Sequence, residues 1–372
     1  MKLELVATCL FGLEHLLGEE IEALGYERIS TIDGRITFLG DEEAVALSNI
    51  FLRYAERVFI KVGSFRAESF EELFEGTRGL PWANFIGKQD AFPVKGHAIK
   101  SKLHSIPDCQ AIVKKAVVRS LEGEYGISLF SEEGVKLQIE FFILNDVATL
   151  MIDTSGVALH KRGYRREALG APIRETLAAA IAAISRPREK VLLWDPMCGS
   201  GTIAIEAAMM MKNIAPGVGR RFAAEDFPFI DKSVWKYARE EAKDGERVTD
   251  FRAYASDIDP DAVALAEKNA TLAGVGDIVK SFRMDARKIS SEGMRGTIVT
   301  NPPYGERLGT QREAESLYRQ IGEHFRSLAP WQVYVITSHP SFEKLYGKRA
   351  DKVRKLYNGM LPCYLYQYFK NK

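Results

Sequence analysis

Three acidic or amide side chains in the second half of the sequence each follow a short apolar run. Asp195 ends VLLWD, Asp257 ends FRAYASD, and Asn301 comes directly after GTIVT. Apolar runs of this length that alternate with helical stretches are typical of parallel strands. Because the carboxyl ends of parallel strands share one edge of a sheet, we expect these three side chains to surround one ligand site.

The turn after Asp195 reads PMCGSGT and differs from the dinucleotide-binding turn G-x-G-x-x-G. Gly199 and Gly201 allow a tight turn and a close approach of the backbone, and a helix should begin near Thr202. A carboxylate at position 195 would repel a pyrophosphate, but it would suit a cationic amine such as the amino-acid end of S-adenosylmethionine. A purely structural glycine turn is the alternative.

Two further acids could serve the same ligand. Asp257 could accept hydrogen bonds from both ribose hydroxyls, as acids do in Rossmann enzymes. Its structural alternative is a helix N-cap, although Asp259 before Pro260 is better placed for that role. Asp285 follows the next strand and could meet the adenine amino group.

The distance along the chain between the glycine turn and the ribose-type acid is unusual. Gly201 and Asp257 are 56 positions apart, whereas roughly 20 residues usually separate these features. The extra stretch, residues 213–250, is aromatic and charged. We interpret it as an insertion that packs near the ligand site.

The stretch NPPYGERLG, which begins at Asn301, could hold a flat amine. Asn301 offers a side-chain carbonyl, Pro302 offers a backbone carbonyl at a restricted angle, and Tyr304 can stack on a ring. Two fixed acceptors would direct the amine lone pair at a methyl donor, and methyl transfer depends on such preorganised geometry. This chemistry requires neither a metal nor a covalent nucleophile. A proline-rich turn that merely ends a strand is the alternative.

The cysteines and histidines have no spacing typical of a metal site. The cysteines are scattered and suggest neither zinc binding nor a secreted disulfide scaffold, so we expect a cytoplasmic protein without a metal. The apolar run at residues 177–184 is much shorter than the roughly 20 residues that cross a bilayer. We therefore expect no membrane partner.

The elements that position these side chains divide into three predicted domains. Residues 1–66 show a β-α-β-β-α-β order with a hairpin turn at Asp33-Gly34, which is typical of a ferredoxin-like module. Residues 67–165 combine strands with a basic amphipathic helix. In residues 166–372, strands alternate with helices, which indicates an α/β fold with a doubly wound parallel sheet.

The formal net charge of +1 conceals local asymmetry. The first 60 residues hold eleven Asp or Glu against five Lys or Arg. Basic residues dominate residues 85–120 and recur at 161–174 and 344–355. Such clusters are a candidate phosphate-binding surface, and a solvated lysine-rich face is the alternative.

The motifs DPMCGSG, SDID and NPPYGERLG, in that order, resemble those of class I S-adenosylmethionine-dependent methyltransferases that modify exocyclic or amide nitrogens. Over essentially the whole chain, including LVATCLFGLEHLLGEEIEALG and ALHKRGYRREALGAPIRETLAAAI, the sequence resembles the THUMP-domain guanine-N2 methyltransferases of bacterial large-subunit (23S) ribosomal RNA. Some relatives carry a second fused methyltransferase domain. Because this chain ends at Lys372, we expect a single modification.

This resemblance implies a Rossmann-like class I methyltransferase domain preceded by a ferredoxin-like module and a THUMP RNA-binding domain. It implies S-adenosylmethionine as the cofactor, RNA as the partner, and Asn301, Pro302 and Tyr304 as the residues that hold the base. The implied cofactor contacts are Asp195, Gly199, Ser200, Gly201, Thr202, Asp257, Ile258, Asp285, Ala286 and, from the helix before the first strand, Thr176. The implied RNA contacts are Lys100, Lys102, Lys114, Lys115, Arg119, Arg162, Arg165 and Arg166.

Several alternatives to guanine-N2 methylation of ribosomal RNA stay open. The N-P-P-Y motif recognises an amino group, so adenine-N6 methylation of RNA or DNA also fits, as does guanine-N2 methylation of transfer RNA. Protein glutamine methylation shares the motif, although the RNA-binding arm argues against it. Outside the enzymes, the chain could be an inactive RNA-binding assembly factor.

Overall fold

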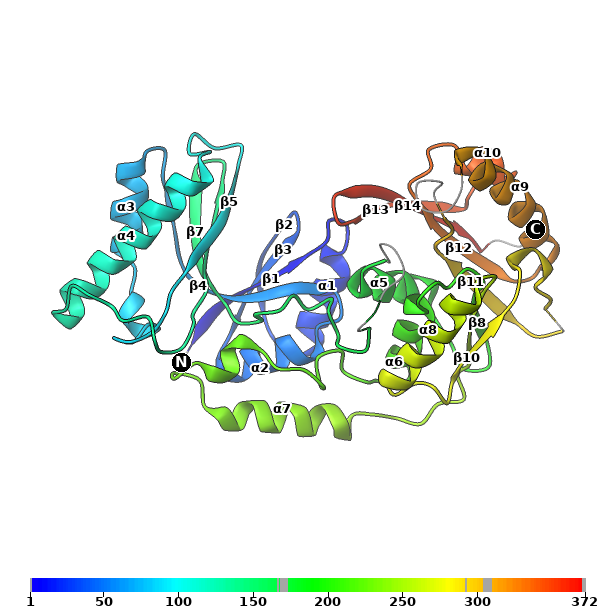
Figure 1. Ribbon diagram of the computed structural model, residues 1–372, viewed down its shortest axis with the longest axis horizontal. Helices are drawn as coiled ribbons and strands as arrows, with labels where there is room; N and C mark the ends of the chain where they lie inside the picture. The colour runs from blue at the N-terminus through cyan, green and yellow to red at the C-terminus, as the bar shows by residue number, and fades with distance from the viewer. Residues whose placement is uncertain (1, 166, 168–172, 292, 304–309, 370–372) are drawn as a thin grey trace.

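Two seven-stranded sheets form the framework of the molecule (Figure 1). The computed structural model describes residues 2–165, 167, 173–291, 293–303 and 310–369. Within these ranges, no helix combines the length and apolarity needed to cross a bilayer. The same ranges hold no group of three or more His, Cys, Asp or Glu side chains suited to a metal ion.

The first domain has the predicted ferredoxin-like order. Its antiparallel strands run β2-β3-β1-β4, and Gly34 takes a left-handed φ of 73° in the turn between β2 and β3. Leu5 and Ala7 of β1 belong to the main core, whereas Val6 is buried in a separate cluster with Phe59 and Met151. The elements are β1 (Leu3–Cys9), α1 (Glu14–Ala23), β2 (Arg28–Ile32), β3 (Arg35–Gly40), α2 (Glu42–Phe51) and β4 (Ala55–Arg66).

The second domain extends the sheet of the first. Strand β7 pairs antiparallel with β4, from Phe59↔Asp153 to Arg66↔Val147, so the 12-residue β4 belongs to both domains. The sequence patterns did not predict this joint sheet. The elements are α3 (Phe70–Arg78), η1 (Trp82–Asn84), β5 (Val94–Ile99), α4 (Ile106–Tyr125), β6 (Ile139–Leu144) and β7 (Val147–Asp153).

The third domain contains the predicted doubly wound sheet, with strand order β10-β9-β8-β11-β12-β14-β13. The strands from β10 to β12 are parallel, and β14 and β13 complete the sheet in antiparallel pairings. The first half comprises α5 (Glu175–Ser185), β8 (Leu192–Asp195), α6 (Thr202–Met211), η2 (Ala223–Asp226), α7 (Lys232–Asp244), β9 (Ala253–Asp257) and α8 (Pro260–Leu272). The second half comprises β10 (Val279–Arg283), η3 (Ala286–Lys288), β11 (Gly296–Thr300), α9 (Gln311–Ser327), β12 (Gln332–Thr337), α10 (Phe342–Tyr346), β13 (Lys352–Asn358) and β14 (Leu361–Tyr368).

The inserted stretch, residues 213–250, does not pack near the ligand site, so that prediction was wrong. Its helix α7 packs on α2 of the first domain, as Figure 1 shows along the lower edge of the molecule. The Gly217 amide donates to the Ile50 carbonyl (2.8 Å), and the Ala224 amide donates to the Thr154 carbonyl (3.0 Å). The apolar face of the insertion is thus buried against the N-terminal half, which ties the two halves together.

Candidate active site

Strand order brings the predicted ligand-binding side chains to one edge of the C-terminal sheet. Strand β8 pairs with β9 on one side and with β11 on the other. The chain runs outward from β8 through β9 to β10, and then crosses to β11 on the other side of β8. Asp195, Asp257 and Asn301 therefore lie at the carboxyl ends of three adjacent parallel strands. This is the topological switch point at which open α/β sheets bind ligands.

Asp195 is buried at this edge, with 2% of its surface exposed. Its Oδ1 accepts hydrogen bonds from the Thr300 hydroxyl (2.7 Å) and the Met197 amide (3.3 Å). Burial raises the pKa of the Asp195 carboxyl to about 7, and the negative charge of Asp257 acts in the same direction. A cationic group beside this carboxyl would reverse the effect, because it favours the charged form.

Thr300 is a site residue that the sequence analysis missed. It is the last residue of β11, fully buried, and directly precedes Asn301. A hydroxyl side chain at the end of an otherwise apolar strand was the available signal. Its hydrogen bond to Asp195 joins the acidic turn to the Asn-Pro-Pro turn.

The glycine turn combines an open approach with close helix packing. Gly199 and Gly201 take left-handed φ values of 51° and 79°. A Cβ on Gly199 would meet no atom within 4 Å, whereas a Cβ on Gly201 would lie 2.9 Å from that of Ala266 in α8. Gly199 therefore leaves its backbone accessible to a ligand, and Gly201 lets α6 and α8 approach each other.

Asp257 holds the glycine turn and does not cap helix α8. Its Oδ2 accepts from the Gly199 amide (2.9 Å), and its Oδ1 accepts from the Asp259 amide (3.1 Å). Asp259 is the N-cap of α8, because its own carboxylate accepts from the Asp261 amide (2.9 Å). The alternative role considered for Asp257 thus belongs to Asp259.

The neighbourhood of the third acid is more crowded. Arg287 donates from Nε to Oδ1 of Asp285 (2.8 Å) and from Nη2 to Oδ2 (2.5 Å). Hydrogen bonds from Arg287 lower the pKa of the Asp285 carboxyl. The adjacent Ala286 is buried, while Ile258, directly after Asp257, is 57% exposed and offers an apolar surface.

The Asn-Pro-Pro turn follows β11 as predicted. The buried Tyr318 of α9 donates from its hydroxyl to the Pro303 carbonyl (2.8 Å) and lies 3.3 Å from the Thr337 hydroxyl at the end of β12. Tyr318 therefore fixes the turn through a hydrogen bond to its backbone. The helical spacing of Tyr318 in the sequence is equally typical of a residue that only packs in the core. Tyr304 lies outside the described residues.

The structure corrects the role predicted for Thr176. This residue is fully buried, and its hydroxyl donates to Glu56 of β4 (2.5 Å). Glu56 also accepts from Arg174 (2.7 Å) and contacts His160 (3.0 Å). The side chain of Thr176 thus joins α5 to the first domain and is not directed to a cofactor.

Two of the predicted RNA contacts, Arg162 and Arg165, point into the protein and donate hydrogen bonds there. Arg162 is 6% exposed and donates to the backbone carbonyls of Leu159 and Arg53. Its guanidinium therefore cannot reach a phosphate in this conformation, which corrects the prediction. Arg166 lies outside the described residues.

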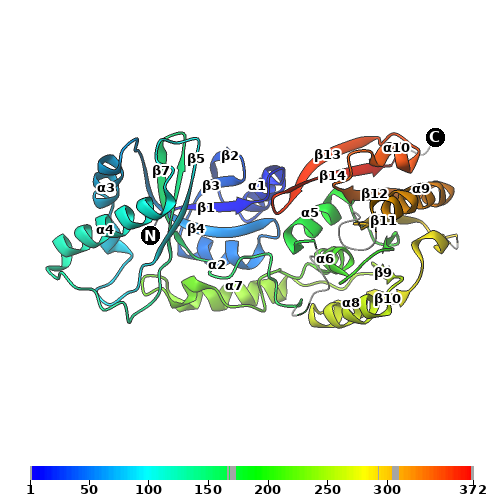
Figure 2. The same ribbon diagram turned by 45° about the horizontal axis from the view of Figure 1, so that its top comes forward.

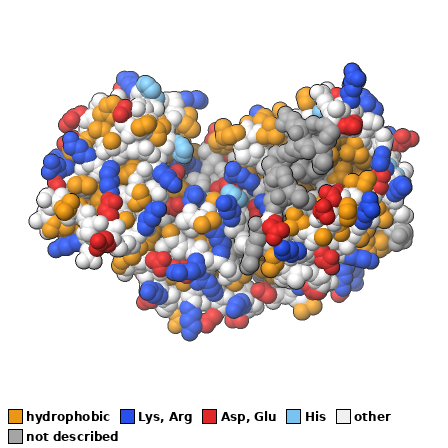
Figure 3. All heavy atoms as spheres, in the orientation of Figure 1, with side chains coloured by type: hydrophobic (Ala, Val, Ile, Leu, Met, Phe, Trp, Pro, Cys, Tyr) orange, Lys and Arg blue, Asp and Glu red, His pale blue; other side chains and the backbone are white. Residues whose placement is uncertain are grey.

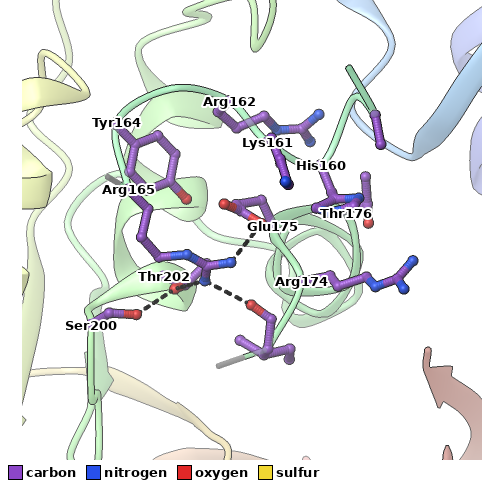
Figure 4. A network of polar contacts seen from close by, with 12 residues as sticks. His160, Lys161, Arg162, Tyr164, Arg165, Arg174, Glu175, Thr176, Ser200 and Thr202 are labelled. Atoms are coloured by element: carbon purple, nitrogen blue, oxygen red, sulfur yellow. Dashed lines mark hydrogen bonds and ion pairs between the residues drawn. The ribbon is translucent and has the colours of Figure 1, made fainter. Parts of the chain in front are cut away.

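Figure 4 shows that Arg165 points toward the start of helix α6. It donates to the Thr202 hydroxyl (3.0 Å), to Glu175 (2.9 Å) and to the Ile173 carbonyl (2.9 Å). Ser200 and Thr202 are both buried, and their hydroxyls lie 3.0 Å apart. The guanidinium of Arg165 is thus engaged in bracing the glycine turn, and its side chain is only 11% exposed.

The remaining predicted RNA contacts lie at the surface on and near α4. Lys102 pairs with Glu68, Lys114 pairs with Glu132, and Arg119 pairs with Glu122. Lys115 is exposed, with its ammonium 5.7 Å from the ring centre of Phe74, and Lys100 is exposed with a φ of 49°. These side chains are accessible, and acidic neighbours offset part of their charge.

The strand order, the acidic glycine turn and the Asn-Pro-Pro turn together define a Rossmann-like methyltransferase domain. The chain belongs to the family of RMKL-like methyltransferases, whose domain profile matches residues 162–367. The RlmL ferredoxin-like domain matches residues 4–59 and the THUMP domain matches residues 67–153, so both predicted N-terminal domain types are confirmed. The limits 1–66, 67–165 and 166–372 stay predictions.

Two relatives illustrate the relationship. A Bacillus subtilis protein, provisionally named as an RNA methyltransferase, is 43% identical over 99% of this chain and 96% of that protein. The ribosomal RNA large subunit methyltransferase K/L of Psychromonas ingrahamii is 33% identical over 96% of this chain. The chain spans about half of that second relative, 49% of its length.

Solved structures match over the full length. A provisionally named methyltransferase in complex with SAH has 41% identity and a TM-score of 0.93, covering 100% of this chain and 99% of the other. A predicted N6-adenine-specific DNA methylase from Listeria monocytogenes has 43% identity and a TM-score of 0.93, covering 100% and 97%. SAH is S-adenosylmethionine without its methyl group, which agrees with the predicted cofactor.

Proposed function

We propose that this protein transfers a methyl group from S-adenosylmethionine to the exocyclic N2 amine of a guanine in large-subunit ribosomal RNA. The observation that carries the proposal is the position of the Asn-Pro-Pro turn. It follows the strand next to β8, so amine acceptors and a nucleoside-type site share one edge of the sheet. The family membership, the THUMP domain and the K/L relative supply the substrate class.

The residues at the switch point fit the proposed cofactor, which supplies an activated methyl group on a sulfonium when bound. Each carboxylate oxygen of Asp257 accepts one backbone hydrogen bond and keeps acceptor capacity for a ribose hydroxyl. The exposed Ile258 can cover one face of an adenine ring, with Asp285 beside it. Asp195 offers a carboxylate to the amino-acid end, and the accessible backbone of Gly199 allows the ligand to approach closely.

The Asn-Pro-Pro turn would orient the substrate amine. The amide oxygen of Asn301 and the backbone carbonyl of Pro302 would each accept one N–H of the guanine amine, which leaves its lone pair for the methyl group. Tyr318 keeps the turn rigid through the Pro303 carbonyl. Tyr304 would stack on the extruded base, a contact worth about 1–3 kcal/mol.

The THUMP domain would supply affinity for the RNA backbone. The exposed Lys100, Lys102, Lys115 and Arg119 and the half-buried Lys114 stay candidates for phosphate contacts, because lysine and arginine side chains at a surface can displace the counterions of RNA. Their acidic partners would have to exchange for phosphate. The target guanine would then leave its stack at a cost of roughly a few kcal/mol.

Adenine-N6 methylation is the second candidate. The solved Listeria relative carries that predicted activity on DNA, and the turn recognises an amine and not a particular ring. The THUMP domain weighs toward RNA. An inactive assembly factor fits less well, because the described part of the site retains Asp195, Asp257 and Asn301 in place.

Mass spectrometry of nucleosides from a strain that lacks the protein tests the proposal. Ribosomal RNA, transfer RNA and DNA would be separated before digestion. We expect N2-methylguanosine to disappear from one position of the large ribosomal RNA only. Loss from transfer RNA would redirect the substrate, and loss of N6-methyladenine would replace the reaction.

A further inference from the structure

The β13–β14 hairpin projects past the carboxyl edge of the C-terminal sheet. Thr337, the last residue of β12, pairs with Tyr364 of β14, and the hairpin continues to the pair Asn358↔Leu361. Three further residues at about 3.3 Å each place the turn about 10 Å beyond the edge. The hairpin therefore stands on the edge from which a substrate must enter.

The base of this hairpin adjoins the substrate turn. The Tyr318 hydroxyl contacts both the Pro303 carbonyl (2.8 Å) and the Thr337 hydroxyl (3.3 Å). Thr337 is in turn the register partner of Tyr364. One buried tyrosine thus connects the proposed base-holding turn with the strand that carries the hairpin.

The hairpin is fixed at its far end by the first domain. The ring of Tyr357 packs edge-on against Phe11, with centroids 5.6 Å apart. A Cβ on Gly12 would lie only 3.0 Å from the Lys355 carbonyl, so the two backbones are in close contact. Figure 2 shows the hairpin reaching over α5 toward α1. Held at both ends, it can present its turn to a ligand with little loss of entropy on binding.

The turn itself presents a large apolar side chain to solvent. Met360 is 94% exposed and follows Gly359, whose φ is 66°. Val353 and Leu361 on the same hairpin are 43% and 36% exposed. A single exposed apolar residue is ordinary, but this one stands at the tip of a fixed projection whose base adjoins the substrate turn.

Cations lie next to this tip. A Cβ on Gly359 would be 3.7 Å from Nη2 of Arg174, whose side chain is 38% exposed although it pairs with Glu56 (2.7 Å). Lys355 is exposed on β13. Figure 3 shows Lys, Arg and His side chains around the indentation between the two lobes of the molecule. The positive charge beside the tip thus suits a polyanion, and the apolar tip suits the ring faces that such a polyanion carries.

We propose that the hairpin tip is an RNA-contacting wedge, with Met360 packing against bases exposed when the target guanine leaves its stack. Arg174 and Lys355 contact the flanking phosphates. Methionine suits this role because its thioether packs favourably on aromatic rings, and apolar wedges support unstacked bases in other nucleic-acid complexes. The proposal rests on the proposed function and adds a substrate-positioning element to it.

Steady-state methylation kinetics of Met360 variants test the wedge. The substrate is large ribosomal RNA from the strain that lacks the protein, with labelled S-adenosylmethionine. We expect Met360→Ala to lower kcat/KM for RNA about tenfold, Met360→Asp to lower it further, and Met360→Leu to keep most of it. The KM for S-adenosylmethionine should not change in any of these variants.

A matched control is Val248→Ala, which shortens a side chain that is 98% exposed in the loop before β9 and should change nothing. Unchanged RNA kinetics for Met360→Ala, beside an active parent protein, would overturn the wedge and leave the proposed function intact. A raised KM for S-adenosylmethionine would overturn it as well, because the tip would then act on the cofactor site. Failure of the parent protein to methylate RNA would overturn both proposals.

Discussion

Two basic clusters have opposite environments in this molecule. On and near α4, Lys102, Lys114 and Arg119 reach solvent and pair with acids at the surface. Between the two halves, Arg162 and Arg165 are withdrawn from solvent and donate to backbone carbonyls, a hydroxyl and a carboxylate. Counting charges along the sequence therefore locates cations but does not separate RNA contacts from interior braces.

The difference follows from the chemistry of the side chains. A guanidinium has five donors in a rigid fork and can satisfy several acceptors at once, whereas an ammonium is a compact and strongly hydrated charge. Arginine is accordingly suited to a junction rich in carbonyl groups. Lysine on an exposed helix keeps its charge available for a phosphate.

The largest effect should come from Arg162→Ala. Its Nε lies 3.5 Å from Oε1 of the fully buried Glu206, which would lose this ion-pair partner. We expect the free energy of unfolding to fall by about 3–5 kcal/mol, measured by urea denaturation. Adding Glu206→Gln should recover part of this loss, and an unchanged midpoint for Arg162→Ala would show that the junction does not depend on the ion pair.

Asp195→Asn tests how the burial of an acid affects the free energy of unfolding. In the folded chain the Asp195 carboxyl keeps its proton up to about pH 7, whereas an aspartate in the unfolded chain loses its proton at about pH 4. Burial of this acid therefore costs increasing stability as the pH rises from about 4 to 7, and a constant amount above that range. Without cofactor, the free energy of unfolding of Asp195→Asn should exceed that of the parent by up to about 4 kcal/mol at pH 8. Below about pH 4 the two should be nearly equal.

Urea denaturation across this pH range measures the effect. A stability difference that stays constant from pH 4 to 8 would contradict the raised pKa. Calorimetry at pH 8 should show that the same variant loses affinity for S-adenosylmethionine, because the carboxylate proposed for its amino group is gone.

Arg165→Lys should have a smaller effect that falls on the cofactor. The fork that joins Thr202 to Glu175 would be lost while the charge stays, so we expect cofactor affinity to fall about tenfold with binding of RNA unchanged. Calorimetry and filter binding separate the two. Weaker RNA binding with normal cofactor affinity would return Arg165 to the RNA surface.

Charge reversal at Lys114 and Lys115 should have the smallest effect on the fold and should act on RNA alone. We expect weaker RNA binding and a shallower dependence of affinity on salt, because fewer counterions are released. Thermal melting should stay close to that of the parent. A salt dependence identical to the parent would remove this part of α4 from the RNA surface.

Much of the fold could be predicted because its signals are local. The turn at Asp33-Gly34, the alternating strands and the helical spacings each depend on neighbouring residues. The positions of Asp195, Asp257 and Asn301 followed from the same reasoning, because each ends or directly follows a strand. The Asp259 cap was foreseen from Pro260 beside it.

Features that depend on contacts distant in sequence could not be predicted. The joint sheet needs β4 to pair with β7, and neither strand encodes its partner. The docking of α7 on α2, the burial of Arg162 beside Glu206 and the link from Thr176 to Glu56 are of the same kind. Each is set by tertiary packing that local patterns do not contain.

The most direct test of the central claim is complementation of the strain that lacks the protein, read out by nucleoside mass spectrometry of its large ribosomal RNA. The parent protein should restore N2-methylguanosine, and Asn301→Ala should not, although calorimetry should find its affinity for S-adenosylmethionine nearly unchanged. Full restoration by Asn301→Ala would contradict the role of the Asn-Pro-Pro turn. Restoration of a different methylated nucleoside by the parent would contradict the proposed reaction.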